Sequence, residues 1–160
     1  MNYELVIERL SEKNFNNFLH LIEKLAEYEN LDPPNSDAKI RLKKDGISKN
    51  PKYEAFLGII NGKPVSYIIY FMTYSSFLAL PTLYLEDIFV LKEHRKKGIG
   101  QEMFDFCVKQ AKKRDCGRLE LCVLDWNEPA IKFYKKNKLQ CLDWKFFRLN
   151  REQINKYPNN

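Results

Sequence analysis

A strand, a glycine turn, a helix and a second strand follow one another in the second half of the chain, and they constrain the fold most. Residues 82–90 are typical of a strand, and apolar side chains recur at helical spacing over residues 99–114. Residues 118–124 return as a strand. A crossover of this length implies that the two strands run parallel.

The other segments predict an α+β fold, mixed α/β in its order, with about four helices. The pair Asn61-Gly62 favours a type I′ turn, so the strands on either side form a hairpin. Either Ser11 or Asn14 can cap the first helix, and Ser36 can cap the second. The expected strands are 3–10, 53–60, 65–74 and 139–149, and the expected helices are 15–28, 36–46 and 127–137.

Composition limits the classes of protein to which the chain can belong. It has 160 residues, 44% of them hydrophobic, which predicts one domain over residues 1–160. No apolar run approaches the roughly 20 residues that span a bilayer, so we expect no membrane partner and a cytoplasmic location. The four cysteines form no Cys-x-x-Cys pair and there are two histidines, so we expect no metal. A net charge of +6 is compatible with an anionic ligand.

The turn between the strand and the helix has the features of an anion site. Gly98 and Gly100 lie where the helix begins, where backbone N–H groups have no partner within the helix. Glycine lets a phosphate approach the backbone, and Arg95, Lys96 and Lys97 supply positive charge. A glycine-containing helix start beside a solvated basic loop is the simpler interpretation of these residues.

Two common phosphate motifs do not fit. A Walker loop needs Lys followed by Ser or Thr after its last glycine, but Gln101 and Glu102 stand there. A dinucleotide fingerprint needs a third glycine where Met103 lies.

Four segments together resemble the GNAT superfamily of N-acetyltransferases, and within it the diamine (spermidine/spermine) N-acetyltransferases. They are Leu-Ala-Glu-Tyr-Glu at 25–29, Leu-Tyr-Leu-Glu-Asp-Ile-Phe-Val at 83–90, the turn at 95–100, and Trp-Asn-Glu-Pro-Ala-Ile-Lys-Phe-Tyr at 126–134. The resemblance implies a twisted, mostly antiparallel sheet whose two parallel strands splay apart, with acetyl-CoA in the gap. It implies cofactor contacts from Ile88, Phe89, Val90, Arg95, Lys96, Lys97, Gly98, Ile99, Gly100, Gln101, Asn127, Glu128, Pro129, Ala130 and Tyr134.

The same resemblance implies a catalytic pair and a substrate side. Tyr134 would protonate the leaving thiolate, and Tyr28, Glu29 and Glu86 would face the amine. The chemistry needs such a carboxylate, because an aliphatic amine with a pKa near 10.4 is protonated at neutral pH, and Glu86 could accept its proton. Strand alternation places Asp87 on the opposite face, as a structural partner. A bulge could turn the N–H groups of the strand toward the developing oxyanion.

Two features depart from a simple fit. Lys138 stands where the family usually has glycine, so we expect Asn137 to take the left-handed conformation that ends the helix. Cys122 lies near the cofactor strand, but no neighbouring base in the sequence could activate it, so we favour direct transfer over an acetyl-cysteine.

The sequence therefore predicts an acetyl-CoA-dependent N-acetyltransferase acting on a small primary amine, a polyamine or diamine, as a homodimer without a nucleic-acid partner. Two enzyme alternatives stay open: acetylation of a peptide or protein, and acetylation of a lysine-like amino acid such as thialysine. A third is a non-catalytic CoA-binding module whose basic helix end at 109–118 touches nucleic acid.

Overall fold

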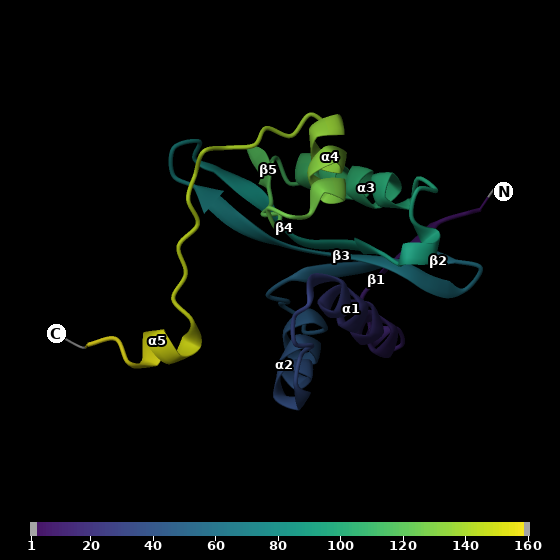
Figure 1. Ribbon diagram of the computed structural model, residues 1–160, viewed down its shortest axis with the longest axis horizontal. Helices are drawn as coiled ribbons and strands as arrows, with labels where there is room; N and C mark the ends of the chain where they lie inside the picture. The colour runs from purple at the N-terminus through teal and green to yellow at the C-terminus, as the bar shows by residue number, and fades with distance from the viewer. Residues whose placement is uncertain (1–2, 159–160) are drawn as a thin grey trace. The chain divides into compact units, whose positions relative to one another are not determined.

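The computed structural model describes residues 3–158, which form five strands and five α-helices (Figure 1). The chain divides into two compact units, Met1–Cys122 and Val123–Asn160, which are described separately. The first contains β1 (Val6–Arg9), α1 (Phe15–Glu29), α2 (Ser36–Gly46), β2 (Glu54–Ile60), β3 (Lys63–Ser75), β4 (Leu80–Val90), the short 3₁₀ helix η1 (Lys92–His94), α3 (Ile99–Lys113) and β5 (Arg118–Glu120). The second contains α4 (Glu128–Lys136) and α5 (Arg151–Asn155).

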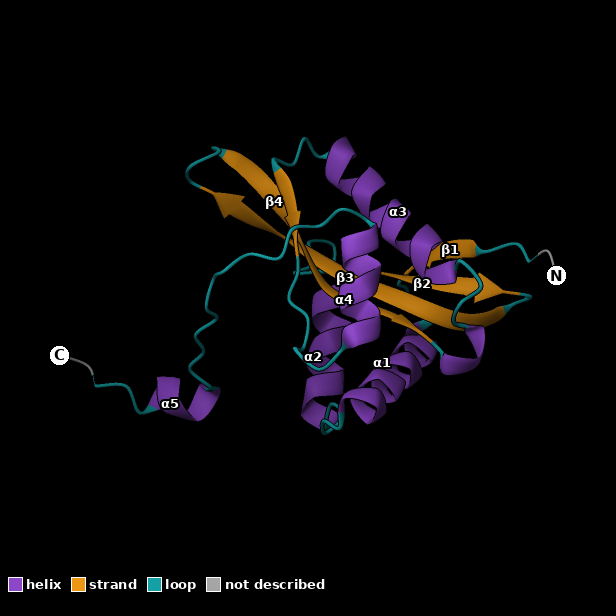
Figure 2. Cartoon of the chain, turned by 45° about the horizontal axis from the view of Figure 1, so that its top comes forward, coloured by secondary structure: helices purple, strands orange, loops and turns teal. Residues whose placement is uncertain are grey.

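The sheet has the predicted mixed topology. Its strands lie in the order β1-β2-β3-β4-β5; the first four pair antiparallel and β5 pairs parallel to β4 (Figure 2). Asn61 and Gly62 both have positive φ, 50° and 74°, which is the conformation of a type I′ turn. The α+β class and the parallel pair predicted from the sequence are thus confirmed.

Helices cover the two faces of this sheet (Figure 1). On the α1 face, Phe18 and Leu21 are fully buried and pack in one cluster with Tyr67, Ile69 and Phe89 of the sheet. On the other face α3 contacts β4 and buries its apolar side chains, among them Ile99, Met103 and Cys107. Both faces of the sheet are therefore apolar near their centres, whereas the end of β4 carries polar groups.

Several predicted boundaries were wrong, each for a local reason. The first strand begins at Val6 instead of residue 3. Helix α2 is capped by Asn35 instead of Ser36, because the Asn35 side chain accepts a hydrogen bond from the Ala38 N–H at 2.9 Å. Strand β5 ends at Glu120 instead of residue 124, because its pairing with β4 stops there.

The expected closing strand at residues 139–149 is also wrong. The segment has no regular secondary structure, and several of its large apolar side chains are exposed: Trp144 by 76%, Phe146 by 69% and Phe147 by 87%. A strand needs a neighbour with which its backbone can bond, and within residues 3–158 this segment has none.

Helix α4 ends in a way that the sequence did not suggest. Lys138 itself takes the left-handed conformation, with φ 63°, while Asn137 has φ −82°. The Leu139 N–H donates to the Tyr134 carbonyl and the Lys138 N–H donates to that of Lys135, which is the Schellman pattern. The usual helix stop therefore forms with lysine in place of the family's glycine, and the expectation for Asn137 was wrong.

Within residues 3–158, no helix is long and apolar enough to cross a membrane. The cytoplasmic location stays a prediction.

Candidate active site

The parallel strands β4 and β5 pair over a short distance and then part. Their register runs from Thr82 opposite Arg118 to Tyr84 opposite Glu120, and β4 continues alone to Val90. Just beyond the last pair, the Tyr84 hydroxyl donates a hydrogen bond to the Cys122 sulfur at 3.2 Å. Beyond this pair, no strand within residues 3–158 pairs with this edge of β4.

The same stretch of β4 contains a β-bulge. Leu85 lies opposite Tyr70 of β3, but Ile69 lies opposite Asp87, so Glu86 is one extra residue. Asp87 therefore lies on the α1 face, whereas unbroken alternation would place it on the face of Leu85. The alternation on which we based the placement of Asp87 is interrupted at this point.

Carboxylates gather around the bulge. The buried Tyr67 hydroxyl donates to the Asp87 carboxylate at 3.2 Å. Burial, reinforced by the charge of Glu86, raises the pKa of Asp87 to about 6. Burial also raises the pKa of Glu29, at the end of α1, and its charge acts on both Asp87 and Tyr67.

No ion pair within residues 3–158 neutralises Glu29, Glu86 or Asp87. Among the described residues, no group of three or more His, Cys, Asp or Glu side chains could hold a metal ion. This acidic cluster, defined as Glu29, Glu86 and Asp87, is suited to an organic cation.

The glycine turn begins α3 as the sequence predicts. Gly98 is the N-cap residue with φ 90°, a conformation that side chains rarely adopt, and Lys96 is also left-handed at 59°. Gln101 and Glu102 donate the first helical hydrogen bonds, to the Gly98 carbonyl. The N–H groups before them lie at the positive end of the helix dipole, where an anion is stabilised.

Packing within the protein does not require glycine at position 100. A β-carbon built at this position would meet only Val90, at 3.7 Å, which is ordinary contact. At Gly98, in contrast, φ alone demands glycine. The open side of Gly100 leaves room for a phosphate against the helix start, so this turn fits the diphosphate of coenzyme A.

The basic side chains of the turn have different surroundings. Arg95 lies over the ring of Tyr28, with its guanidinium carbon 4.5 Å from the ring centroid, and its Nε donates to the Val90 carbonyl at 2.9 Å. Lys97 donates to the Glu93 carbonyl at 2.8 Å. Arg95 is thus anchored on the α1 side of the strand, where it lines a pocket of about 350 Å³.

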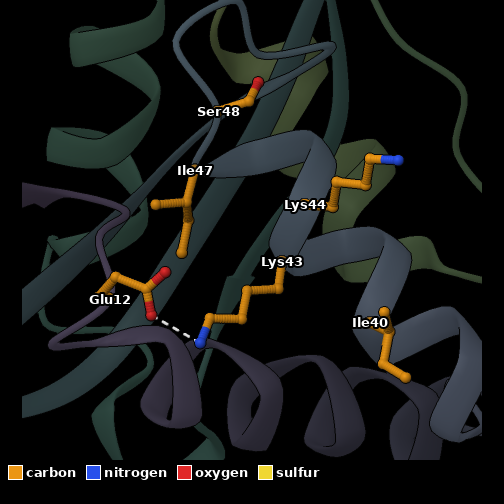
Figure 3. Close-up of a pocket in the computed structure, with 6 residues that line it drawn as sticks. All are labelled: Glu12, Ile40, Lys43, Lys44, Ile47 and Ser48. Carbon is orange, nitrogen blue, oxygen red and sulfur yellow. Dashed lines mark ion pairs between the residues drawn. The ribbon is translucent and has the colours of Figure 1, made fainter.

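The pocket beside Arg95 is formed by the end of α1 and the segment that follows β4. Its lining residues are Lys24, Glu27, Tyr28, Phe89, Leu91, Lys92, Glu93 and Arg95. A second pocket of about 350 Å³ lies beside α2, where Lys43 and Glu12 form an ion pair at 2.6 Å (Figure 3). The first pocket shares Tyr28, Phe89 and Arg95 with the predicted site, and the second shares no residue with it.

The remaining predicted residues belong to the second unit. Asn127 caps α4, its side chain accepting from the Ala130 N–H at 3.4 Å, with Pro129 in the first turn. Tyr134 lies two turns further along, with its ring 5.5 Å from that of Phe133.

The first unit therefore brings together most of the predicted site. Its members are Tyr28, Glu29, Glu86, Ile88, Phe89, Val90, Arg95, Lys96, Lys97, Gly98, Ile99, Gly100 and Gln101. The side chains of Phe89 and Ile99 are buried. The adjacent carboxylates Glu86 and Asp87 within a strand had marked this place in the sequence, but sequence reasoning missed Tyr67, the hydrogen-bond partner of Asp87.

Comparison with known proteins agrees with this geometry. Residues 16–138 match the acetyltransferase (GNAT) family. The thialysine N-epsilon-acetyltransferase of Bos taurus is 33% identical over 94% of this chain and 95% of its own length. The L-ornithine N5-acetyltransferase NATA1 of Arabidopsis thaliana is 38% identical over 55% of this chain and 39% of its own.

Among solved structures, an aminoglycoside N-acetyltransferase AAC(6')-Iy in complex with CoA has the same fold. Its TM-score is 0.78 at 14% identity, with 94% of this chain and 97% of that chain covered. A splayed parallel pair beside a glycine turn defines a CoA-dependent acyltransferase fold. The chain belongs to the GNAT acetyltransferase family, it is an N-acetyltransferase, and its acetyl donor is acetyl-CoA.

A charge placed at Gly100 tests the phosphate site. Both Gly100→Asp and Gly100→Asn fit the open space, and Asp at a helix start stabilises the helix by about 0.3–1 kcal/mol. We expect the Asp variant to unfold at the same or higher temperature than the Asn variant and yet to bind CoA at least tenfold more weakly, measured by calorimetry. Equal CoA affinities would contradict a phosphate at this turn.

The raised pKa of Asp87 predicts a pH-dependent stability. An unfolded Asp titrates near 3.9, so the folded state, with its pKa of about 6, loses stability as the pH rises from 4 to 7. Relative to Asp87→Asn, the wild-type chain should be about 1–3 kcal/mol less stable at pH 7 and equally stable near pH 4. Urea unfolding at several pH values measures this, and a difference independent of pH would refute it.

Proposed function

We propose that the protein acetylates the primary amine of a small molecule by direct transfer from acetyl-CoA. The observation that carries this proposal is the acidic cluster without a cationic partner, at the bulge where β4 continues beyond its pairing with β5. The thialysine and ornithine acetyltransferases named above act on short chains that end in a primary amine, which supports it. A diamine or polyamine, as predicted from the sequence, has the same reactive group.

The acidic cluster first binds the ammonium form of the substrate and then takes its proton. Glu86 is exposed and accepts the proton directly or through water. The Asp87 carboxylate, whose pKa of about 6 lies close to neutrality, is a second acceptor. The neutral nitrogen then has the lone pair with which it attacks.

The cofactor supplies an acetyl group activated as a thioester. Backbone N–H groups of Ile88 and Val90, which point away from β3 beyond the bulge, would stabilise negative charge that develops on the carbonyl oxygen. Tyr134 would give its proton to the departing sulfur as the carbon–sulfur bond breaks. For Tyr134, and for the contacts of residues 127–130 with the cofactor, the support is the resemblance of residues 126–134 to the family. Lys96 and Lys97 would complete the charge around the diphosphate.

The activity test is release of free thiol from acetyl-CoA in the presence of a panel of amines. We expect turnover with small diamines or diamino acids, and a loss of roughly 100-fold or more in kcat for Glu86→Gln and for Tyr134→Phe, the scale of one acid–base group. CoA affinity should stay the same for Glu86→Gln. This unchanged affinity is the control that the variant is folded.

The other two functions are separated in the same experiment. Turnover of lysine-containing peptides without turnover of free amines would favour a peptide substrate. DNA retention that weakens steeply with salt, in a chain that binds no CoA, would favour the nucleic-acid module. Unchanged turnover in both Glu86→Gln and Tyr134→Phe would remove the proposed roles.

We further propose that the active form is a homodimer. The segment 139–149 exposes Trp144, Phe146 and Phe147, more apolar surface than a short solvated segment usually carries. A second copy of the chain would cover these side chains, and its sheet edge offers backbone groups with which an unpaired segment can bond.

Light scattering tests the dimer. The double variant Trp144→Ser, Phe146→Ser should be monomeric at concentrations where the wild-type chain is dimeric. Phe77→Ser, at a fully exposed aromatic between β3 and β4, is the matched control and should stay dimeric. A monomeric wild-type chain, or a double variant that still dimerises, would contradict this interface.

A further inference from the structure

Tyr3, in the segment that leads into β1, lies against the glycine turn. Its hydroxyl shares a hydrogen bond between two acceptors, the Lys97 carbonyl and the Glu102 carboxylate, the second at 3.0 Å. A β-carbon built at Gly98 would meet the same hydroxyl oxygen at 3.2 Å. Tyr3 therefore joins the start of the chain to both sides of the residue that begins α3.

This contact fixes the direction of one backbone N–H group. In a planar trans peptide the N–H points away from the preceding carbonyl, and the chain has no cis peptide among its described residues. Because the Lys97 carbonyl points to Tyr3, the Gly98 N–H points to the opposite side. Glycine accepts φ of either sign, so without the hydroxyl this peptide could turn over. With it, Gly98 is held at φ 90°.

The Gly98 N–H is the first of three donors at the start of α3. Gln101 and Glu102 both donate to the Gly98 carbonyl, so the N–H groups of Gly98, Ile99 and Gly100 come before the first hydrogen bonds of the helix. Successive N–H groups at such a turn form a concave site for phosphate oxygens. The direction of the first donor therefore affects how well a phosphate fits.

The same hydroxyl holds an acidic side chain in the first turn of α3, that of Glu102. A carboxylate at a helix start is stabilised by the same donors and the same dipole as a phosphate, so a released Glu102 side chain would compete with one. Burial and the hydrogen bond to Glu102 raise the pKa of Tyr3. The hydroxyl therefore keeps the proton that it donates.

We propose that Tyr3 is a positioning residue for the diphosphate of coenzyme A. It directs the Gly98 N–H toward the phosphate oxygens, and it keeps the Glu102 carboxylate away from them. Tyr3 acts through these two groups, and it prepares the turn before the cofactor binds. The inference rests on the proposed function in one respect, the place of the diphosphate at this turn.

Tyr3→Phe tests this, because it removes the hydroxyl and keeps the ring. We expect CoA affinity, measured by calorimetry, to fall about three- to tenfold, the range of one hydrogen bond, and KM for acetyl-CoA to rise by the same factor. The kcat at saturating acetyl-CoA and the KM for the amine should stay the same. In Gly100→Asp, which already displaces the diphosphate, Tyr3→Phe should weaken CoA binding less than twofold.

A second variant tests the part of Glu102. In the Tyr3→Phe chain, Glu102→Gln should strengthen CoA binding at least twofold more than the same change does in the wild-type chain, because the released charge is removed. Tyr74→Phe, at an exposed tyrosine of β3, is the matched control and should leave CoA affinity unchanged.

Unchanged CoA affinity in Tyr3→Phe would overturn the proposal, and so would an equal loss in the wild-type and Gly100→Asp chains. A change in kcat or in the KM for the amine would show a general structural role instead. Equal CoA affinities of Gly100→Asp and Gly100→Asn would remove the diphosphate site itself. A difference between those two, without an effect of Tyr3→Phe, would refute the role of Tyr3 alone.

Discussion

The extra residue at Glu86 in β4 is the feature on which the arrangement of the site depends. Without it, Asp87 would face the α3 side with Leu85, where burial among apolar side chains would be costly for a carboxylate. With it, Asp87 meets the Tyr67 hydroxyl on the α1 face, and Phe89 follows on the same side to support Arg95. Val90 returns to the α3 side, where it lies against Gly100. One bulge therefore places Asp87 and Phe89 on the α1 face of β4, and Val90, beside Gly100, on the other.

This division also keeps opposite charges apart. Burial, and after it the charges of the other cluster members Glu86 and Glu29, raise the pKa of Asp87. Had Lys96 or Lys97 been placed among these carboxylates, their charges would cancel before a ligand arrived. Instead the lysines remain with the turn and the start of α3, and no ion pair within residues 3–158 neutralises the cluster.

The sequence predicted the elements that local interactions determine. It missed the features that depend on pairing between strands. Asn61-Gly62 and the apolar spacing of α1 and α3 act within a few residues, and those elements formed as expected. The bulge depends on how β4 pairs with β3, which no local pattern records, so the sequence could not place it at Glu86. Residues 139–149 have the composition of a strand, yet a strand forms only beside a partner. At Lys138, helix-ending hydrogen bonds outweighed the preference for glycine or asparagine.

The charge of the whole chain disfavours the approach of a polycation. A net charge of +6 repels cations at distances up to the screening length, about 8 Å at physiological salt. A polyamine is protonated on every nitrogen and meets the full repulsion, whereas a diamino acid has one of its two ammonium charges cancelled by its carboxylate. The acidic cluster acts only at short range, so it attracts a cation only near the bulge. A zwitterionic end approaches a basic protein more easily than a second ammonium does.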